Sequence, residues 1–342
     1  MRALNRTYLH RQLLLERHSM PAIEAVRHLI ALQAQEPNWP YLGLWTRLRD
    51  FRLDELTELM DGRQAMRTTL IRTTQHLVAT DDLRWLRPTV QRVLGRTSLS
   101  PYFTGALQGI EVDELVEKAR ELLDGEVMTR KELGALLGER YPGRDERLLA
   151  ATAELILPMY HPCCTWGRWG TRPGQTVALV GEMRAPDVRR MVERYLAAYG
   201  PATIMDVQAW SGLTKLREVM DEMPLERSGA LYDLPDMPEI SPDVPAPVRF
   251  VPAFDNLILA HKDRTRIISD ADRKRVIHGA GMVRPTFLVD GFVHGMWAIK
   301  GKALRVLPFR PVPDEDEVYG EATRLAAFLG LAKVELLTPD ES

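Results

Sequence analysis

Apolar side chains near the start of the chain recur at helical spacing and then give way to a strand-like segment. The helical spacing covers residues 7–15, 21–32 and 53–60. Pro37 and Pro40 are expected to interrupt any helix between the second and third of these. Residues 70–78 are rich in β-branched side chains and predict a strand or a wing. Helices followed by a short hairpin are typical of a winged helix.

The same order of elements is predicted twice more. Thr129 is expected to cap a helix, because Glu132 follows it at the spacing of a capping box. The other predicted helices cover residues 111–123, 147–157, 187–198, 203–210 and 215–223. Strands are predicted around 177–180 and 230–234. Units of this size, repeated at irregular spacing, indicate tandem copies of one small domain.

A proline-rich connector over residues 235–247 leads to a region with a different pattern. The predicted strands there are 254–259, 266–268, 286–289, 292–299, 304–306 and 334–337. Asp290-Gly291 separates two apolar runs and predicts a hairpin, and a helix is predicted over 317–329. The expected fold is therefore α+β. It consists of three winged-helix units (1–95, 110–182 and 185–235) and a β-rich region (248–342).

Composition limits the class of protein without naming a partner. The chain has 342 residues, of which 45% are hydrophobic and 27% are charged, as in globular proteins. No apolar run approaches the ~20 residues that span a bilayer, and the first residues lack a secretory signal, so we expect a cytoplasmic protein without a membrane partner. The net charge is −2, although arginine, which suits phosphate contacts, greatly outnumbers lysine. The adjacent Cys163 and Cys164 are expected to be reduced thiols.

Common catalytic motifs are missing from the sequence. It contains no GxxxxGK[ST] phosphate loop, no GxSxG elbow and no HExxH helix. The eight histidines are scattered without metal-ligand spacing. An enzyme of this sequence is therefore expected to work without a metal, a nucleotide cofactor or a strong nucleophile.

Three stretches together carry a specific resemblance. They are the segment from Leu32-Gln33-Ala34-Gln35-Glu36-Pro37 to Leu44-Trp45; Arg249-Phe250-Val251-Pro252 with Phe254-Asp255-Asn256-Leu257; and Phe287-Leu288-Val289-Asp290-Gly291-Phe292-Val293 with Gly295 and Trp297. In this order they resemble the AlkZ/YcaQ-like winged-helix DNA glycosylases. The resemblance extends over nearly the whole chain.

The resemblance implies both an architecture and an activity. It implies three tandem winged helices and a β-rich region arranged around a DNA-binding concavity. The implied activity is excision of N7-alkylated purines, including the unhooking of interstrand crosslinks. The two glutamines of the family's Gln-x-Gln motif match Gln33 and Gln35, which are therefore the expected catalytic residues.

The chemistry explains how two uncharged amides can be sufficient. Alkylation at N7 makes the purine a cation, so it leaves as a neutral base without delivery of a proton. What remains is to hold water near C1′ and to tolerate positive charge on the sugar, and a carbonyl oxygen can serve both purposes. We assign water positioning to Gln35 and a supporting or sugar-phosphate contact to Gln33. The expected partner is double-stranded DNA carrying alkylated purines, bound by a monomer.

Basic and aromatic side chains near the predicted hairpins are the candidate DNA contacts. These candidates are Arg72, His76, Trp166, Arg168, His261, Arg264 and Arg266. For the last three, a structural ion pair with Asp263 or Asp270 is an alternative role.

Two other functions compete with catalysis. The first is a winged-helix transcriptional regulator, which normally presents polar side chains along its recognition helix. The second predicted helix instead carries Ile23, Val26, Leu29 and Ile30, so it is expected to be buried. The second competitor, a non-catalytic scaffold, has the least support.

Overall fold

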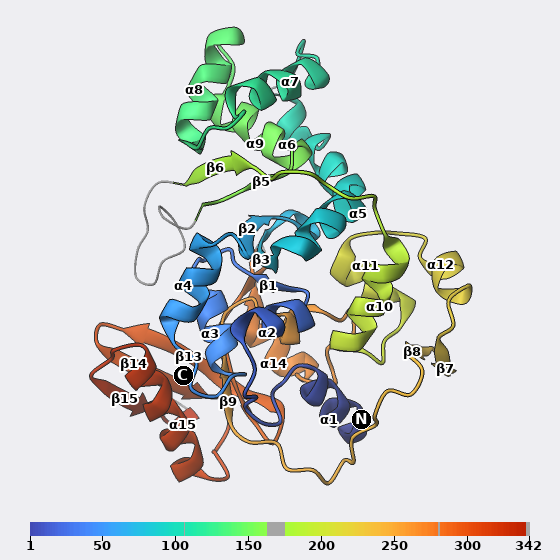
Figure 1. The fold of residues 1–342 in the computed structure, drawn as a ribbon. Coiled ribbons are helices and arrows are strands. Elements are labelled where there is room, and N and C mark those ends of the chain that lie inside the picture. The colour runs from blue at the N-terminus through green and yellow to red at the C-terminus, as the bar shows by residue number, and fades with distance from the viewer. Residues whose placement is uncertain (106, 163–174, 280, 340–342) are drawn as a thin grey trace.

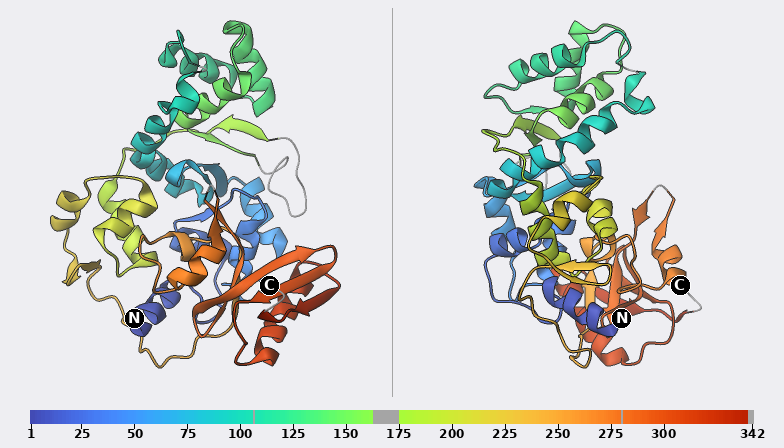
Figure 2. Two further views of the ribbon diagram at one scale, coloured as in Figure 1. Left: turned by 180° about the vertical axis from the view of Figure 1, so that it is seen from behind. Right: turned by 90° about the vertical axis from the view of Figure 1, so that its right-hand side faces the viewer.

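The computed structural model describes residues 1–342 with the exception of 106, 163–174, 280 and 340–342. Its helices and strands form a body that contains both termini, and one helical unit protrudes from this body (Figures 1 and 2). The protruding unit has an apolar core of its own. The predicted α+β class is confirmed.

The first part of the chain folds helices around a small antiparallel sheet. Its elements are α1 (Arg2–Arg11), α2 (Ala22–His28), β1 (Ala31–Gln33), α3 (Trp39–Trp45), α4 (Leu53–Asp61), β2 (Ala65–Thr69), the 3₁₀ turn η1 (Ile71–Thr73) and β3 (Gln75–Ala79). The strands pair in the order β1-β3-β2. The apolar face of α2 is buried as expected, with Val26 at its centre.

Two predictions in this part are wrong in detail. The helix expected to run to residue 32 ends at His28, because the chain reverses at Ile30 (φ 65°) and continues as β1. Pro40 does not prevent a helix. It lies in the first turn of α3, where its missing N–H is not needed.

A helix that the pattern did not predict connects the first part of the chain to the protruding unit. This helix, α5 (Thr80–Ser98), runs through Pro88 without ending, and the short α6 (Pro101–Thr104) follows. Pro88 cannot donate to the carbonyl of Arg84, and the backbone N–H of Arg184 does so instead at 2.9 Å.

The protruding unit repeats the topology of the first part. Its elements are α7 (Val112–Leu122), β4 (Met128–Thr129), α8 (Arg130–Arg140), α9 (Glu146–Ile156), β5 (Met159–Tyr160) and β6 (Thr176–Leu179). The strand order β4-β6-β5 matches that of β1-β3-β2. The predicted capping box of α8 is confirmed: Thr129 accepts from the Glu132 backbone N–H at 3.1 Å, and the Glu132 carboxylate accepts from that of Thr129 at 2.7 Å.

A third set of elements has the same order in a smaller form. It consists of α10 (Val188–Tyr199), α11 (Ile204–Ser211), α12 (Arg217–Asp221), β7 (Glu226–Ser228) and β8 (Leu231–Asp233). A single bridge between Ala202 and Tyr232 stands where the first strand of the other two sets pairs with the last.

The C-terminal region is built on a five-stranded sheet in the order β15-β14-β13-β12-β9. Its elements are β9 (Arg249–Val251), α13 (Asn256–Leu259), α14 (Asp270–Val276), β10 (Ile277–His278), β11 (Met282–Val283), β12 (Thr286–Val289), β13 (Phe292–Lys300), β14 (Ala303–Pro308), α15 (Glu315–Phe328) and β15 (Lys333–Leu336). The helix α15 packs on this sheet. The hairpin turn at Asp290-Gly291 is confirmed, and both residues have positive φ.

The strands predicted over 254–259 and 266–268 are wrong. The first segment forms the short helix α13, which begins because the Asp255 carboxylate accepts from the Leu257 backbone N–H at 2.8 Å. The second is a turn, in which Ile267 and Ile268 are buried. No described helix is both long enough and apolar enough to cross a membrane.

Candidate active site

Gln33 and Gln35 lie where β1 ends beside the hairpin of β2 and β3. Gln33 is the last residue of β1, is paired with His76 of β3, and is only 8% exposed. Gln35 lies beyond the strand and its side chain is exposed. The motif thus presents one amide to solvent and keeps the other almost buried behind it.

The backbone between the two glutamines is held from two strands. The N–H of Ala34 donates to the carbonyl of Gln75 at 2.7 Å, and Nε of Arg67 donates to the carbonyl of Ala34 at 2.7 Å. Arg67 is buried, and burial lowers its pKa to about 10, so the guanidinium stays charged at neutral pH. Ala34 is therefore fixed by a strand on one side and by a cation on the other.

The side-chain carbonyl of Gln33 faces an arginine in a strained turn. Nη2 of Arg72 lies 3.4 Å from Oε1 of Gln33, and Nη1 donates to the backbone carbonyl of Trp210 at 2.9 Å. Arg72 adopts the left-handed conformation (φ 51°), which costs energy for a residue with a side chain. The contact directs the Gln33 carbonyl toward the cation and makes the NH₂ end of the amide the one available to a substrate.

The side-chain carbonyl of Gln35 is also oriented by a donor. Its Oε1 accepts from the backbone N–H of Gln75 at 3.4 Å, a long hydrogen bond. A carbonyl oxygen has two lone pairs, so the second can accept from a water molecule. Gln35 therefore presents an acceptor to solvent at a fixed place.

His76 completes the floor of this site, and it is neutral. Its side chain is fully buried, and burial, with the nearby charge of Arg72, lowers its pKa to about 3. Nδ1 lies 3.0 Å from the carbonyl of Thr74, to which it donates. Farther inside, Trp210 packs against Tyr195 and Tyr199 with ring centroids 5.2 and 5.8 Å apart. With His76 neutral, the charged group that contacts the Gln33 side chain here is the guanidinium of Arg72.

The structure does not gather the remaining predicted DNA contacts on one surface. His76, His261 and Arg266 are buried, where the phosphates of a duplex cannot reach them. His261 lies edge-on against Tyr8 at 4.7 Å, and Arg266 donates to the carbonyl of Pro201 at 2.8 Å. All three pack inside the protein, and the partner of Arg266 is a backbone carbonyl and not the carboxylate of Asp263 or Asp270.

The other candidate DNA contacts differ in their exposure and in whether the structure describes them. Arg264 is half-buried and Arg72 is partly buried, so both reach the surface. Trp166 and Arg168 lie outside the described residues. Arg67 and Gln75, which hold the motif, carried no sequence signal, because their role comes from strand pairing.

Within the described ranges, no three histidine, cysteine, aspartate or glutamate side chains converge as ligands of an ion would. The side chains described beside Gln33 include the guanidinium of Arg72 and the neutral imidazole of His76.

Comparison with known proteins identifies the class. The family model described as "DNA glycosylase AlkZ-like" matches residues 26–328, and the chain belongs to this family. It is a DNA glycosylase, and this favours catalysis over the transcriptional regulator that the sequence had left open.

One known sequence and one solved structure, both from Streptomyces sahachiroi, are similar to the chain over nearly its whole length. The interstrand DNA cross-link repair glycosylase of Streptomyces sahachiroi is 27% identical over 370 residues, and the alignment covers 95% of each chain. The solved structure of Streptomyces sahachiroi DNA glycosylase AlkZ superposes with a TM-score of 0.83 and 24% identity, covering 98% of both chains. The latter shows that the fold is shared.

Proposed function

We propose that this protein hydrolyses the N-glycosidic bond of cationic N7-alkylated purines in duplex DNA, including bulky adducts and interstrand crosslinks. The observation that carries the proposal is the pair of amides at the end of β1, each with its carbonyl oxygen oriented by an N–H donor. The S. sahachiroi relative is described as an interstrand cross-link repair glycosylase, which supports a crosslinked substrate here.

The reaction needs little from the protein because the lesion is already a cation. As the C1′–N9 bond breaks, its electron pair moves onto the purine and neutralises the charge, and the sugar becomes oxocarbenium-like. Water then bonds to C1′ and loses a proton to solvent. Gln35 accepts a hydrogen bond from this water, and its partial negative charge favours the developing positive charge on the sugar.

Gln33 has the complementary role. With its carbonyl directed to Arg72, its NH₂ group can donate to the sugar-phosphate backbone and fix the deoxyribose against Gln35. Both functions are positional, so the enzyme should be slow on neutral, unmodified bases, whose leaving group still needs activation.

The three repeated sets of elements are proposed to be winged helices, over 1–95, 110–182 and 185–235, with 248–342 as the β-rich region. The identical strand orders of the first two sets support this assignment. We propose that they bind DNA in a shared concavity, with contacts from Arg72, Arg264, Trp166 and Arg168.

An exposed Gln35 suits a crosslinked substrate. A guanine tethered to the opposite strand cannot swing into an enclosed pocket as a flipped base does. An acceptor displayed on the surface can reach the sugar of such a nucleotide while the base stays near the duplex. We further expect a monomer that acts in the cytoplasm without a nucleotide cofactor.

An excision assay tests the proposal directly. Protein is incubated with duplexes that contain 7-methylguanine or a nitrogen-mustard crosslink, and abasic sites are then cleaved by hot alkali. We expect scission at the lesion that persists with chelator and without nucleotide, and no adduct trapped by borohydride, because no lysine attacks the sugar. Folded protein that binds the duplex tightly but leaves both lesions intact would instead be a DNA-binding regulator.

A further inference from the structure

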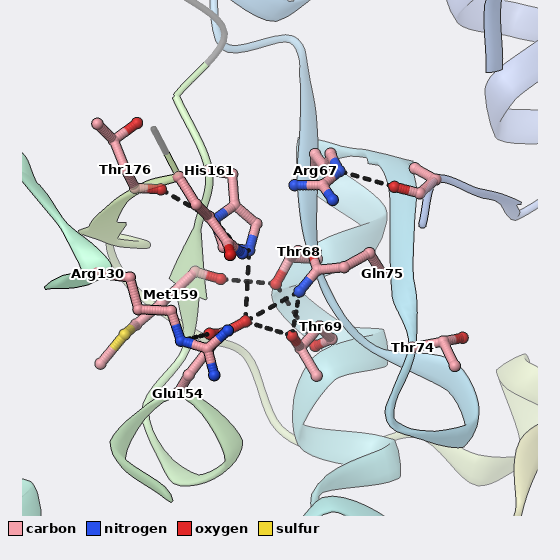
Figure 3. A network of polar contacts seen from close by, with 12 residues as sticks. Arg67, Thr68, Thr69, Thr74, Gln75, Arg130, Glu154, Met159, His161 and Thr176 are labelled. Atoms are coloured by element: carbon pink, nitrogen blue, oxygen red, sulfur yellow. Dashed lines mark hydrogen bonds and ion pairs between the residues drawn. The ribbon is translucent and has the colours of Figure 1, made fainter. Parts of the chain in front are cut away.

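A buried carboxylate in the protruding unit lies directly behind the hairpin that holds the Gln-x-Gln motif. Glu154 of α9 is only 4% exposed. Figure 3 shows its side chain among polar groups from both units. Burying a charged carboxylate is costly unless several donors surround it, so this position requires an explanation.

Polar and charged side chains from four segments of the chain converge on Glu154. Oε1 accepts from Thr69 at the end of β2 and, at 2.9 Å, from Nε2 of Gln75 at the start of β3. Nε2 of His161, just after β5, lies 3.3 Å from the same oxygen, and Nε of Arg130 in α8 lies 3.4 Å from Oε2. Burial alone would raise the pKa of Glu154, but the side chain of His161, the charge of Arg130 and the Thr69 hydroxyl hold it well below its usual range.

Gln75 connects this carboxylate to the proposed catalytic residue. Its side chain is fixed by Glu154 and by Oγ1 of Thr69 at 2.6 Å. Its backbone N–H donates to Oε1 of Gln35, and its backbone carbonyl accepts from Ala34. A displacement of the Gln75 side chain would therefore be transmitted to Gln35 through two backbone atoms.

A second connection between the same units ends on the same residues. The backbone N–H of His161 donates to the carbonyl of Arg67 at 2.8 Å, and the guanidinium of Arg67 holds the carbonyl of Ala34. The protruding unit thus supports both hydrogen bonds that fix Ala34, one through Gln75 and one through Arg67.

From this geometry we infer that Glu154 is a positioning residue for base excision: through Gln75 it sets the place of the Gln35 side chain. The inference rests on the proposed function, because it assigns Glu154 a role in the reaction of Gln35. If Glu154 only joined the two units, its replacement would change the excision rate constant only together with protein stability or DNA affinity.

The variants E154Q and Gln75→Met test the inference. E154Q keeps the shape of the side chain but removes its charge, and Gln75→Met removes the anchor while leaving the backbone atoms that contact Gln35 and Ala34. We expect each variant to lower the single-turnover rate constant for 7-methylguanine excision by about 10- to 100-fold, because small displacements of a positioning group have effects of this size. The Kd for the same duplex should change by less than about threefold.

The double variant and a matched control separate positioning from general damage. If the two side chains act through one connection, the double variant is no slower than the slower single variant. Glu321→Gln removes a similarly buried carboxylate, 7% exposed and paired with Arg17 at 2.6 Å, in the distant α15. It should lower the melting temperature but leave the excision rate constant unchanged. Hydrogen exchange of the Ala34 amide should accelerate in E154Q and not in the control.

The outcomes are distinct. Excision at the wild-type rate by E154Q, or independent and multiplicative losses in the double variant, overturns the role of Glu154. If E154Q does not fold, Gln75→Met decides alone. A wild-type protein that leaves cationic purines intact refutes the proposed function, whereas an active wild type with an inactive Gln35→Ala and a fully active E154Q refutes this inference only.

Discussion

Nη2 of Arg72 lies 3.4 Å from Oε1 of Gln33, so the least exposed amide of the motif has its carbonyl turned toward a cation. The cation has a pKa of about 10, lowered by burial, and is therefore present throughout the neutral range. The other contact of this guanidinium is a backbone carbonyl. Within the described part of the chain, the orientation of Gln33 therefore depends on the side chain of Arg72 in the turn between β2 and β3.

The first prediction concerns this turn. Arg72→Met removes the charge, and Arg72→Lys keeps it but loses the two-pronged geometry that reaches both Gln33 and Trp210. Both replacements meet the same left-handed backbone, so their difference reports the charge. We expect Met to lower the single-turnover excision rate constant by about 10- to 100-fold and Lys to recover part of it. Wild-type excision by the Met variant would show that Gln33 needs no orienting cation.

The second prediction concerns the exposed amide. Gln35→Ala should lower the excision rate constant by about 100-fold or more while binding to the duplex persists, because an oriented acceptor is lost. Gln35→Glu should retain much of the rate, since a carboxylate oxygen also accepts from water. Gln64→Ala, at another exposed glutamine, is the control and should excise normally. A fully active Gln35→Ala would remove this residue from the mechanism.

The third prediction concerns pH and stability. The pKa of His76 is about 3 in the folded protein, lowered by burial, compared with about 6.5 when unfolded. Between pH 6.5 and pH 3, His76 binds a proton in the unfolded chain but stays neutral in the folded protein. The free energy of unfolding therefore falls as pH decreases from 6.5 toward 3. Going from pH 7 to pH 5 should cost on the order of 2 kcal/mol from this residue. Denaturant melts should show a shallower decline in His76→Gln, and an unchanged decline would contradict the assignment.

The fourth prediction concerns Gly295 in β13. A Cβ there would overlap the ring of Phe287 and the carbonyl oxygen of Leu307, and would lie 2.8 Å from Cα of Pro308. Gly295→Ala should therefore destabilise the protein by about 1–3 kcal/mol or more. Gly320→Ala in α15 meets nothing within 4 Å and should be neutral or stabilising, because alanine favours helices. Equal melting temperatures for the two variants would refute the packing argument.

The sequence pattern correctly predicted those helices and strands whose start is marked by residues only three or four positions apart. The helix α8 was predicted because Thr129 and Glu132 mark its start. The strand β1 was missed because Ala31 and Leu32 continue the apolar spacing of α2, and the reversal at Ile30 leaves no mark in side-chain type. The segment 254–259 was mistaken for a strand because an apolar run as short as Leu257-Ile258-Leu259 has no diagnostic period.

The residues of the candidate site also fall into those that the sequence predicts and those that only the structure shows. Gln33 and Gln35 were proposed from a motif, whereas Glu154 and Gln75 are brought to it only by the packing of distant segments. His261 and Arg266 were expected at the surface because polar side chains usually are, yet they are enclosed by α1 and the turn before α11. Burial of this kind depends on tertiary contacts, and no window of sequence contains them.

The unbroken path of α5 through Pro88 has a mechanical consequence. One rigid rod contacts both the turn that bears Arg72 and the helix that bears Glu154, so neither can shift far without the other. If a bound duplex displaces the protruding unit, then α5, the turn with Arg72 and the amides of Gln33 and Gln35 should move together with it. The DNA, and not the protein, would then have to change shape when a distorted duplex binds.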